Sequence, residues 1–366
     1  MHSVDIAIVG AGPAGAILGY LLALNGAVSI ALIDKRPLDR DYIKGDSYKC
    51  CGGLLSPSAQ KALASLGLGV PSDVLVSPQL FSVKAIDLPS GLNRQYQRFY
   101  LNMDREKFDR YLAGQAVTKG ATPYFGKTVC AIARDEDGFA LTLNNKQGEK
   151  QLLHARQIVG ADGAASLVRK AFFPGVTMRR YVSLQCAFQG KFPALYYSFF
   201  DQSISDYYAW ALPKGENFYI GAALNEHSAQ KDFAALCKKL TALGLPLTDA
   251  PVDTQASLIL RPRGLLRAYA KDGAYLIGEA GGYISLSSAE GISGAIQSAK
   301  ALYRSLKGTG FSPAAFKKHT FSLRVKYFLK NIKAQGMYVP WLRRLVLALG
   351  MGSIRVDRHA DHRDGI

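Results

Sequence analysis

The fold class of this chain is decided by the stretch Val4-Asp5-Ile6-Ala7-Ile8-Val9-Gly10-Ala11-Gly12-Pro13-Ala14-Gly15. The apolar run 4–9 predicts a strand, the glycine-rich segment 10–15 predicts a tight turn, and residues 16–25 have the pattern of a helix. A second apolar run over 28–33 predicts another strand, which ends at Asp34. This order of segments predicts a βαβ unit at the start of an open α/β sheet.

The glycines of this turn have separate roles in a nucleotide site. Gly10 permits the tight turn, Gly12 lets a pyrophosphate approach the backbone, and Gly15 lets the helix lie close to the strand. The helix N-terminus offers free N–H groups and a positive dipole to phosphate. Asp34 lies about 20 residues beyond the turn, where a carboxylate can accept from a ribose hydroxyl. The unit therefore predicts dinucleotide binding, because an ordinary βαβ turn does not require three glycines at this spacing.

The composition is that of a globular protein with two lobes. The chain has 366 residues, of which 48% are hydrophobic and 20% charged. The apolar segment 16–33 is long enough for a membrane span, but Asn25-Gly26 interrupts it. No signal peptide is predicted, since the first strand begins without a basic leader. Five cysteines without a C-x-x-C pair favour a reducing cytoplasm over a disulfide framework, and no metal site is predicted.

The charge balance is strongly basic. There are 45 Lys and Arg residues against 28 Asp and Glu residues, a formal net charge of +17. Such a balance indicates a diphosphate substrate, an anionic membrane surface or nucleic acid, or else a merely solvated basic surface. Nucleic acid is the least favoured partner, because the basic residues do not form a recognisable recognition module.

Two later segments repeat the order strand, glycine-containing turn, helix. Gly160-Ala161-Asp162-Gly163 follows a strand over 157–159 and precedes a helix that carries Arg169. Gly278-Glu279-Ala280 follows a strand over 274–277, and a helix over 292–306 comes after it. Turns at the carboxyl ends of such strands line the ligand crevice of an open sheet. For the first turn, a simple strand–helix connection is the alternative.

Two shorter sequence patterns predict a helix and a hairpin in the first lobe. Asp104 predicts the N-cap of a helix that runs to Ala116, with Arg105 in its first turn. The tetrapeptide 135–138 predicts a hairpin turn between two strands, with Gly138 in the left-handed αL conformation.

Residues 181–224 differ in composition, because aromatic side chains crowd between recurring turn signals. The pattern predicts an antiparallel meander with one aromatic face, in a second lobe that encloses an apolar substrate. The predicted fold class is α/β, or α+β overall, with a Rossmann-like lobe, an antiparallel-sheet lobe and a helical C-terminus. The predicted lobes are 1–76, 100–175 and 257–311 for the cofactor, 77–99 and 176–256 for the substrate, and 312–366 for the helical C-terminal region.

The C-terminal region is basic and amphipathic. Between Ser312 and Val356 there are nine Lys and Arg residues and no acidic ones. One helical face carries Phe321, Val325, Phe328 and Ile332, and another carries Lys326, Lys330 and Lys333. Such a helix either lies on an anionic membrane surface or packs on the lobes and turns its lysines to water.

The motifs together resemble the FAD-dependent oxidoreductases of the para-hydroxybenzoate hydroxylase superfamily. Within it, Cys51-Gly52-Gly53-Leu54 resembles the C-G-G element of the geranylgeranyl reductase family. The segment Tyr208-Ala209-Trp210-Ala211-Leu212-Pro213 resembles that family's Y-x-W-x-F-P substrate motif. The chain departs from the family pattern at Cys50, Ser205 and Leu212 on the substrate side, and Glu279 replaces the commoner aspartate.

The resemblance implies a Rossmann-like FAD-binding lobe and roles for particular residues. The pyrophosphate would lie on 10–15 and the adenosine ribose at Asp34, while Glu279 would bind the ribityl chain. The implied cofactor-binding residues are Gly10, Gly12, Pro13, Ala14, Gly15, Asp34, Lys35, Arg105, Val129, Asp162, Gly278, Glu279, Gly291 and Ile292. The implied catalytic residues are Cys51, as a proton donor or as a residue that shapes the pocket, Tyr208, as an alternative proton donor, and Trp210, as a wall of the pocket.

The implied activity is reduction of C=C bonds in an apolar or isoprenoid substrate by hydride from reduced FAD. NAD(P)H or another reductant would supply the electrons. One alternative is an FAD-dependent monooxygenase or halogenase that acts on an aromatic substrate. The other is a membrane-associated flavin-binding protein without turnover. The expected location is the cytoplasm, at the inner face of the membrane if the C-terminal helices bind lipid.

Overall fold

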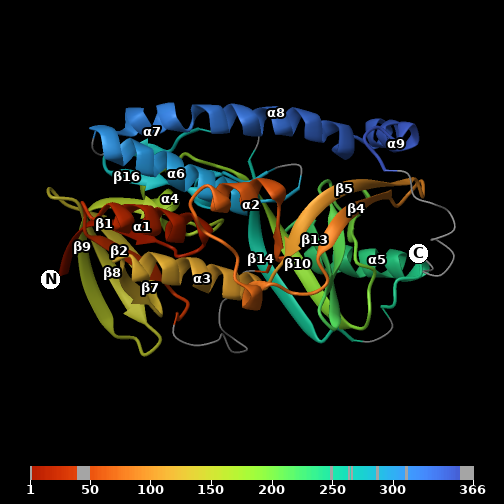
Figure 1. Cartoon of the computed structure of the whole chain (residues 1–366), viewed down its shortest axis with the longest axis horizontal. Helices are drawn as coiled ribbons and strands as arrows, with labels where there is room; N and C mark the ends of the chain where they lie inside the picture. The colour runs from red at the N-terminus through yellow and green to blue at the C-terminus, as the bar shows by residue number, and fades with distance from the viewer. Residues whose placement is uncertain are drawn as a thin grey trace.

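The computed structural model describes residues 2–38, 50–247, 250–262, 264, 267–285, 288–309 and 312–354. It is a mixed α/β structure with two eight-stranded sheets and a helical C-terminal region (Figure 1). The predicted fold class is therefore confirmed. The tail 355–366 of the predicted C-terminal region and the segment 39–49 of the predicted cofactor lobe lie outside the described residues.

The first sheet contains the βαβ unit predicted from residues 4–34. Strand β1 (His2–Val9) pairs in parallel with β2 (Ile30–Asp34), and helix α1 (Pro13–Asn25) connects them. Apolar side chains fill both faces of these strands, as parallel sheets require. The order is β15 (Ala270–Lys271), β16 (Ala274–Leu276), β9 (Lys150–Gly160), β1, β2 and β6 (Thr122–Phe125).

A hairpin of β7 (Lys127–Arg134) and β8 (Phe139–Asn145) extends this sheet by pairing with β9. The predicted turn is present, but the predicted αL conformation of Gly138 is wrong, because its φ is +152°. A Cβ atom at this position would overlap the carbonyl oxygen of Ala155. Close approach to β9 is therefore the reason for glycine here.

The second sheet contains the antiparallel strands predicted for 181–224, but they form a meander only over 196–224. The first of them, Arg179–Gln189, pairs with the last, Asn217–Leu224, and not with the next strand along the chain. The order of this sheet is β14 (Asp253–Arg261), β10 (Arg179–Gln189), β13 (Asn217–Leu224), β12 (Ala209–Lys214), β11 (Tyr196–Phe200), β4 (Leu80–Asp87), β5 (Asn93–Asn102) and β3 (Leu54–Leu55). Strands β14 to β11 are antiparallel along this order, but β11 pairs with β4 in parallel, so the sheet is mixed. β5 and β14 also run across the lobe boundaries predicted at 99/100 and 256/257.

The prediction of one aromatic face is wrong. Phe188, Phe199 and Phe218 pack on one side of the sheet with helix α5 (Ala229–Ala242). Tyr208 and Trp210 belong to a separate cluster with the C-terminal helices. Both faces are aromatic because both are covered, which the alternation of a single strand does not reveal.

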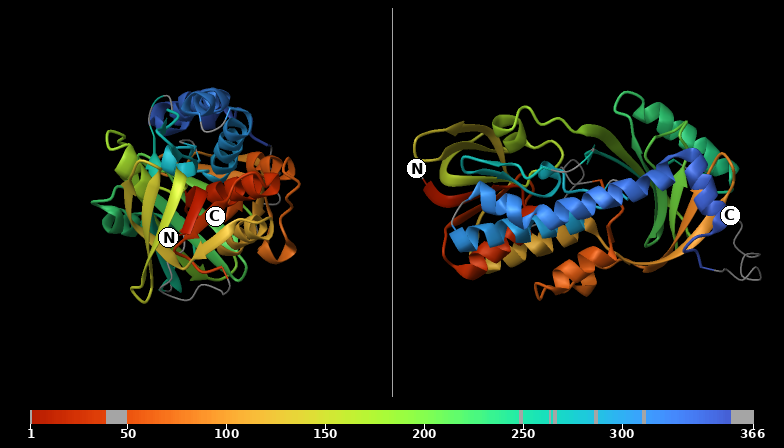
Figure 2. Two further views of the ribbon diagram at one scale, coloured as in Figure 1. Left: turned by 90° about the vertical axis from the view of Figure 1, so that its left-hand side faces the viewer. Right: turned by 90° about the horizontal axis from the view of Figure 1, so that it is seen from above.

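Helices fill the remaining faces. They are α2 (Pro57–Ala64), α3 (Arg105–Thr118), α4 (Leu167–Phe172), α6 (Ile292–Thr309), α7 (Pro313–His319), α8 (Phe321–Tyr338) and α9 (Pro340–Leu349). Asp104 caps α3 through the N–H groups of Glu106 and Lys107, as predicted. α7 and α8 extend along one side of the molecule from the first sheet to the second, where α9 lies (Figures 1 and 2).

Candidate active site

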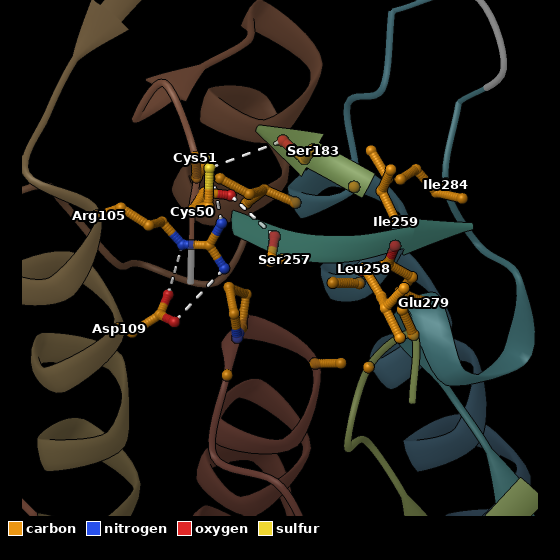
Figure 3. A pocket seen from close by; sticks show the side chains of 18 of the residues that line it. Cys50, Cys51, Arg105, Asp109, Ser183, Ser257, Leu258, Ile259, Glu279 and Ile284 are labelled. Atoms are coloured by element: carbon orange, nitrogen blue, oxygen red, sulfur yellow. Dashed lines mark hydrogen bonds and ion pairs between the residues drawn. The ribbon is translucent and has the colours of Figure 1, made fainter. Parts of the chain in front are cut away.

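Residues of both sheets line a cavity of about 670 Å³ (Figure 3). Of the seventeen site residues predicted from sequence, fifteen line it, whereas Gly15 and Gly278 do not. The structure thus brings together residues from positions 10 to 292 of the chain. Cavities of this size are typical of cofactor and small-molecule sites.

The glycine-rich turn leaves open space at the N-terminus of α1. Gly10 has a φ of +99°, and a Cβ atom there would meet the carbonyl oxygen of Ala161 at 2.5 Å. A Cβ atom at Gly15 would overlap the carbonyl oxygen of Gly10. At Gly12, by contrast, the nearest atom would be Asp109 Oδ2 at 4.0 Å, and no side chain caps the helix. The turn therefore suits a phosphate group.

A chain of ion pairs lines the cavity beside this turn. Asp34 accepts the N–H of Ala11 at 2.7 Å and pairs with Arg36 at 2.9 Å. Arg36 pairs with Asp109 at 3.0 Å, and Asp109 pairs with Arg105 at 2.8 Å. Arg36 and Asp109 were not among the predicted site residues. The i,i+4 spacing of Arg105 and Asp109 on α3 is the signal that could have indicated this pair.

The ion pairs hold Arg105 and Asp109 in their charged forms. Burial alone would raise the pKa of Asp109, but the guanidinium groups of Arg105 and Arg36 outweigh it and lower this pKa below its ordinary value. Burial would lower the pKa of Arg105, yet Asp109 and Cys51 raise it above its ordinary range. The cavity wall therefore carries fixed charges at neutral pH.

The predicted C-G-G element forms a turn against β12. The Sγ of Cys51 accepts the N–H of Gly53 at 3.4 Å and lies 3.5 Å from Arg105 Nη1. A Cβ atom at Gly52 would meet Leu212 Cδ2 at 2.8 Å. Gly53 has a φ of +65°, and a Cβ atom there would meet Lys214 Nζ at 2.6 Å. Glycines are thus required because β12 passes directly against the turn.

Lys214, at the end of β12, was not predicted as a site residue. Its Nζ donates to Asn102 Oδ1 at 2.6 Å and to the carbonyl oxygens of Met103 at 2.8 Å and Gly53 at 3.4 Å. Burial lowers its pKa to about 8. Lys214 therefore connects the C-G-G turn to the N-terminal side of α3.

Two predicted catalytic side chains are held by hydrogen bonds: Trp210 lies on β12, and Tyr208 directly precedes this strand. The indole Nε1 of Trp210 donates to Gln185 Oε1 at 3.2 Å, and the ring lies against Gly221, where a Cβ atom would overlap it. The Tyr208 hydroxyl donates to the carbonyl oxygen of Ser288 at 2.7 Å. Burial raises the pKa of Tyr208 well above its ordinary value.

Glu290 is a further cavity residue that was not predicted. One carboxylate oxygen, Oε1, accepts from Arg98 Nη2 at 2.6 Å and from the Tyr100 hydroxyl at 2.7 Å. The other oxygen is buried and has no hydrogen-bond partner among the described residues. Glu290 directly precedes Gly291 and is the only acidic residue between 280 and 311, which is the signal that could have found it.

The two later turns supply carboxylates to the cavity. Asp162 Oδ2 accepts the N–H of Leu167 at 2.7 Å, while its buried Oδ1 has no partner among the described residues. Burial raises the pKa of Asp162. Glu279 is buried, and its Oε1 accepts the N–H of Leu260 at 2.9 Å. Both side chains lie on the cavity wall, where they can accept hydrogen bonds from a hydroxyl-rich ligand.

The class of protein follows from this fold and site. Residues 3–309 match the family described as FAD binding domain, and the chain belongs to this family. Its cofactor is FAD, and it is an FAD-dependent oxidoreductase. The open space at Gly12 and the unpartnered oxygen of Asp162 fit the pyrophosphate and hydroxyl groups of FAD.

Individual proteins are similar to nearly the whole chain. The chain is 37% identical to Protein CbrA of Escherichia coli O157:H7, over 97% of this chain and 99% of the relative. A geranylgeranyl bacteriochlorophyll reductase-like protein from Thermoplasma acidophilum has the same fold, with a TM-score of 0.79, 19% identity, and coverage of 98% of this chain and 95% of that chain. PqsL of Pseudomonas aeruginosa, a probable FAD-dependent monooxygenase, gives a TM-score of 0.68, 18% identity, and coverage of 96% and 100%.

Proposed function

We propose that this oxidoreductase reduces C=C bonds of an isoprenoid or another lipid-like substrate. The observation that carries the proposal is the contact between the Cys51 turn and β12. It brings together, on the cavity wall, the two segments that resemble the geranylgeranyl reductase family. Apolar side chains of Leu258, Ile259 and Ile284 also line the cavity and suit a hydrocarbon chain (Figure 3).

The predicted cofactor residues would hold FAD as follows. The turn 10–15 would bind the pyrophosphate, and Asp34 would accept from the adenosine ribose. Gly291 and Ile292, at the N-terminus of α6, would offer N–H groups to the edge of the ring. When bound and reduced by an electron donor, FAD would supply a hydride to one alkene carbon.

The second alkene carbon needs a proton, and we propose Cys51 as the donor. Negative charge left on its Sγ would be stabilised by the N–H of Gly53 and the guanidinium of Arg105. Tyr208 is the weaker candidate, because its hydroxyl donates to Ser288 and burial raises its pKa. Trp210, fixed by Gln185, would form a rigid wall for the substrate.

An anaerobic experiment tests the proposal. The purified protein is reduced under argon with NAD(P)H or dithionite, and geranylgeranyl diphosphate or a geranylgeranylated lipid is then added. Return of the oxidised flavin absorbance without oxygen, together with a product two mass units heavier for each bond, is the expected result. Reoxidation only after air is admitted would overturn the proposal.

The alternative function is oxygen chemistry on an aromatic substrate. The observation in its favour is the row of tyrosines, Tyr100, Tyr196 and Tyr208, along the cavity. A monooxygenase or halogenase would consume oxygen faster when its substrate is present. If neither experiment shows turnover, a flavin-binding protein without turnover is the remaining interpretation.

A further inference from the structure

We propose that the outer surface of α8, α9 and the residues that follow them binds an anionic phospholipid bilayer. This surface is called the C-terminal apolar face. Its members are large hydrophobic side chains that are 38% to 66% exposed: Phe321, Phe328, Leu329, Ile332, Trp341, Leu345, Leu349, Met351 and Ile354. The inference goes beyond the proposed function, because it concerns a surface and not the reaction.

The concentration of these side chains is unusual. Fifteen large hydrophobic residues are exposed in the described part of the chain, and nine of them lie between 321 and 354. Trp341 is the most exposed of all, at 66%. Single exposed apolar residues are ordinary on protein surfaces, whereas a concentration of them on one segment is typical of an interaction site.

Helix α8 is apolar on two sides. Leu323, Tyr327 and Ala334 are buried against the rest of the protein. Phe321, Phe328 and Ile332, which lie about a helical turn or two apart, point away from it and are exposed. Packing on the lobes therefore accounts for one apolar side of the helix and leaves the other without a partner in the described part of the chain.

The positive charge of this region favours an anionic lipid surface as the binding partner. The segment 312–354 contains no acidic residue. Lys326 is exposed on α8, which carries the first part of the C-terminal apolar face, and Lys317 and Lys318 are exposed on α7, the helix directly before it. A second copy of this chain would bring like charges together, whereas anionic headgroups complement them. An exposed tryptophan suits the boundary between headgroups and hydrocarbon.

The attachment of the face to the protein is firm. Arg343 of α9 is buried and pairs with the fully buried Asp87 of β4 at 2.5 Å. Arg94 of β5 donates to the carbonyl oxygen of Ala348 at 3.1 Å. No helix in the described part of the chain combines the length and hydropathy needed to cross a bilayer. The geometry therefore points to a helix pair that lies on the membrane.

The face also lies close to the cavity. Tyr327, on the inner side of α8, contacts Gly294, where a Cβ atom would meet its hydroxyl. Lys330 of the same helix interacts electrostatically with Glu290 of the cavity wall. A bilayer bound to the outer side of α8 would thus be separated from the cavity by one helix.

Vesicle flotation of the full-length, FAD-loaded protein tests the inference. The vesicles contain either phosphatidylcholine alone or equal parts of phosphatidylcholine and phosphatidylglycerol. We expect the protein to float with the anionic vesicles at 0.1 M salt, and much less with the neutral ones or at 0.5 M salt. Replacement of Lys317, Lys318 and Lys326 by Glu should weaken partitioning by more than about fivefold for each cation lost.

Apolar variants provide the matched control. The combination F328S, I332S and W341S should abolish flotation, while L24S and V252S, which change residues that are each 58% exposed elsewhere, should leave it unchanged. Flavin absorbance confirms that every variant is folded, so the result does not depend on turnover. Equal loss in the control variants would overturn the inference. Absence of flotation of the native protein would also overturn it. If light scattering then shows that the native protein is a dimer and that the apolar variant is a monomer, the C-terminal apolar face binds a second copy of the chain instead of a bilayer.

Discussion

Arg105 Nη1 lies 3.5 Å from the sulfur of Cys51, at the end of a chain of ion pairs that starts at Asp34. This contact connects the wall beside the phosphate turn to the proposed proton donor. It also makes the anionic form of the sulfur more favourable than it would be in an apolar pocket.

Replacement of Cys51 by Ala should slow anaerobic reoxidation of the reduced flavin by substrate at least about 100-fold, as loss of a general acid does. The flavin content should stay unchanged, because the side chain is not among the predicted cofactor contacts. C50A is the control and should leave the rate unchanged. Cys50 is the adjacent cysteine, but its Sγ lies 3.7 Å from Ser183 Oγ on β10, whereas Arg105 Nη1 contacts the Sγ of Cys51. Equal rates in C51A and the native protein would exclude Cys51 as the donor.

Replacement of Gly53 by Ala should lower both stability and turnover. The residue has a φ of +65°, and a Cβ atom would overlap the carbonyl oxygen of Met103 and approach Lys214 Nζ at 2.6 Å. Gly67 is the matched control, because its φ is +70° and no atom lies within 4 Å. Urea unfolding should show a loss of about 1–2 kcal/mol for G67A, from backbone strain alone, and a larger loss for G53A.

The stability of the protein should depend on Lys214 at alkaline pH. Burial lowers the pKa of this amine from 10.5 to about 8, so between these values the unfolded chain binds more protons than the folded one. Stability must then rise with pH across this window, since the cost of burying the charge is removed. Relative to K214M, the native protein should gain up to about 3 kcal/mol of unfolding free energy from pH 8 to 10.5. Parallel pH profiles of the two proteins would contradict this assignment.

The ion pair between Asp87 and Arg343 should be essential for the position of α9. Replacement of Asp87 by Asn leaves a buried guanidinium without its counter-charge, which costs about 3–5 kcal/mol. E226Q is the control, because Glu226 pairs with Arg180 on the surface at 3.0 Å and such pairs contribute about 1 kcal/mol or less. Urea unfolding at pH 7 compares the two variants, and similar losses would show that the pair does not hold α9.

Local rules predicted the parts of the fold that depend on neighbouring residues. The βαβ unit, the Asp104 cap and the hairpin at 135–138 are all specified within a few tens of residues. The predicted site residues also meet at one cavity, because strand ends and helix starts in such a sheet share an edge. Their individual roles stay predictions.

The missed residues act through partners that are distant in sequence. Arg36 meets Asp109 across 73 positions, Lys214 meets Asn102 across 112, and Glu290 meets Arg98 across 192. No periodicity within one element encodes such a pairing. The parallel contact between β11 and β4 was missed for the same reason, since the two strands are separated by more than a hundred residues.

Helix α8 spans two parts of the interior that belong to different sheets. Its residues Leu323 and Tyr327 pack in the core around α1 and α6, and the ring of Tyr338 lies 5.6 Å from that of Tyr207 near the second sheet. If the two sheets moved apart by a hinge motion, one end of this helix would have to lose its packing against the protein interior. The helix therefore fixes the spacing of the sheets, and the cofactor and substrate must enter and leave the cavity without a hinge movement between the two sheets.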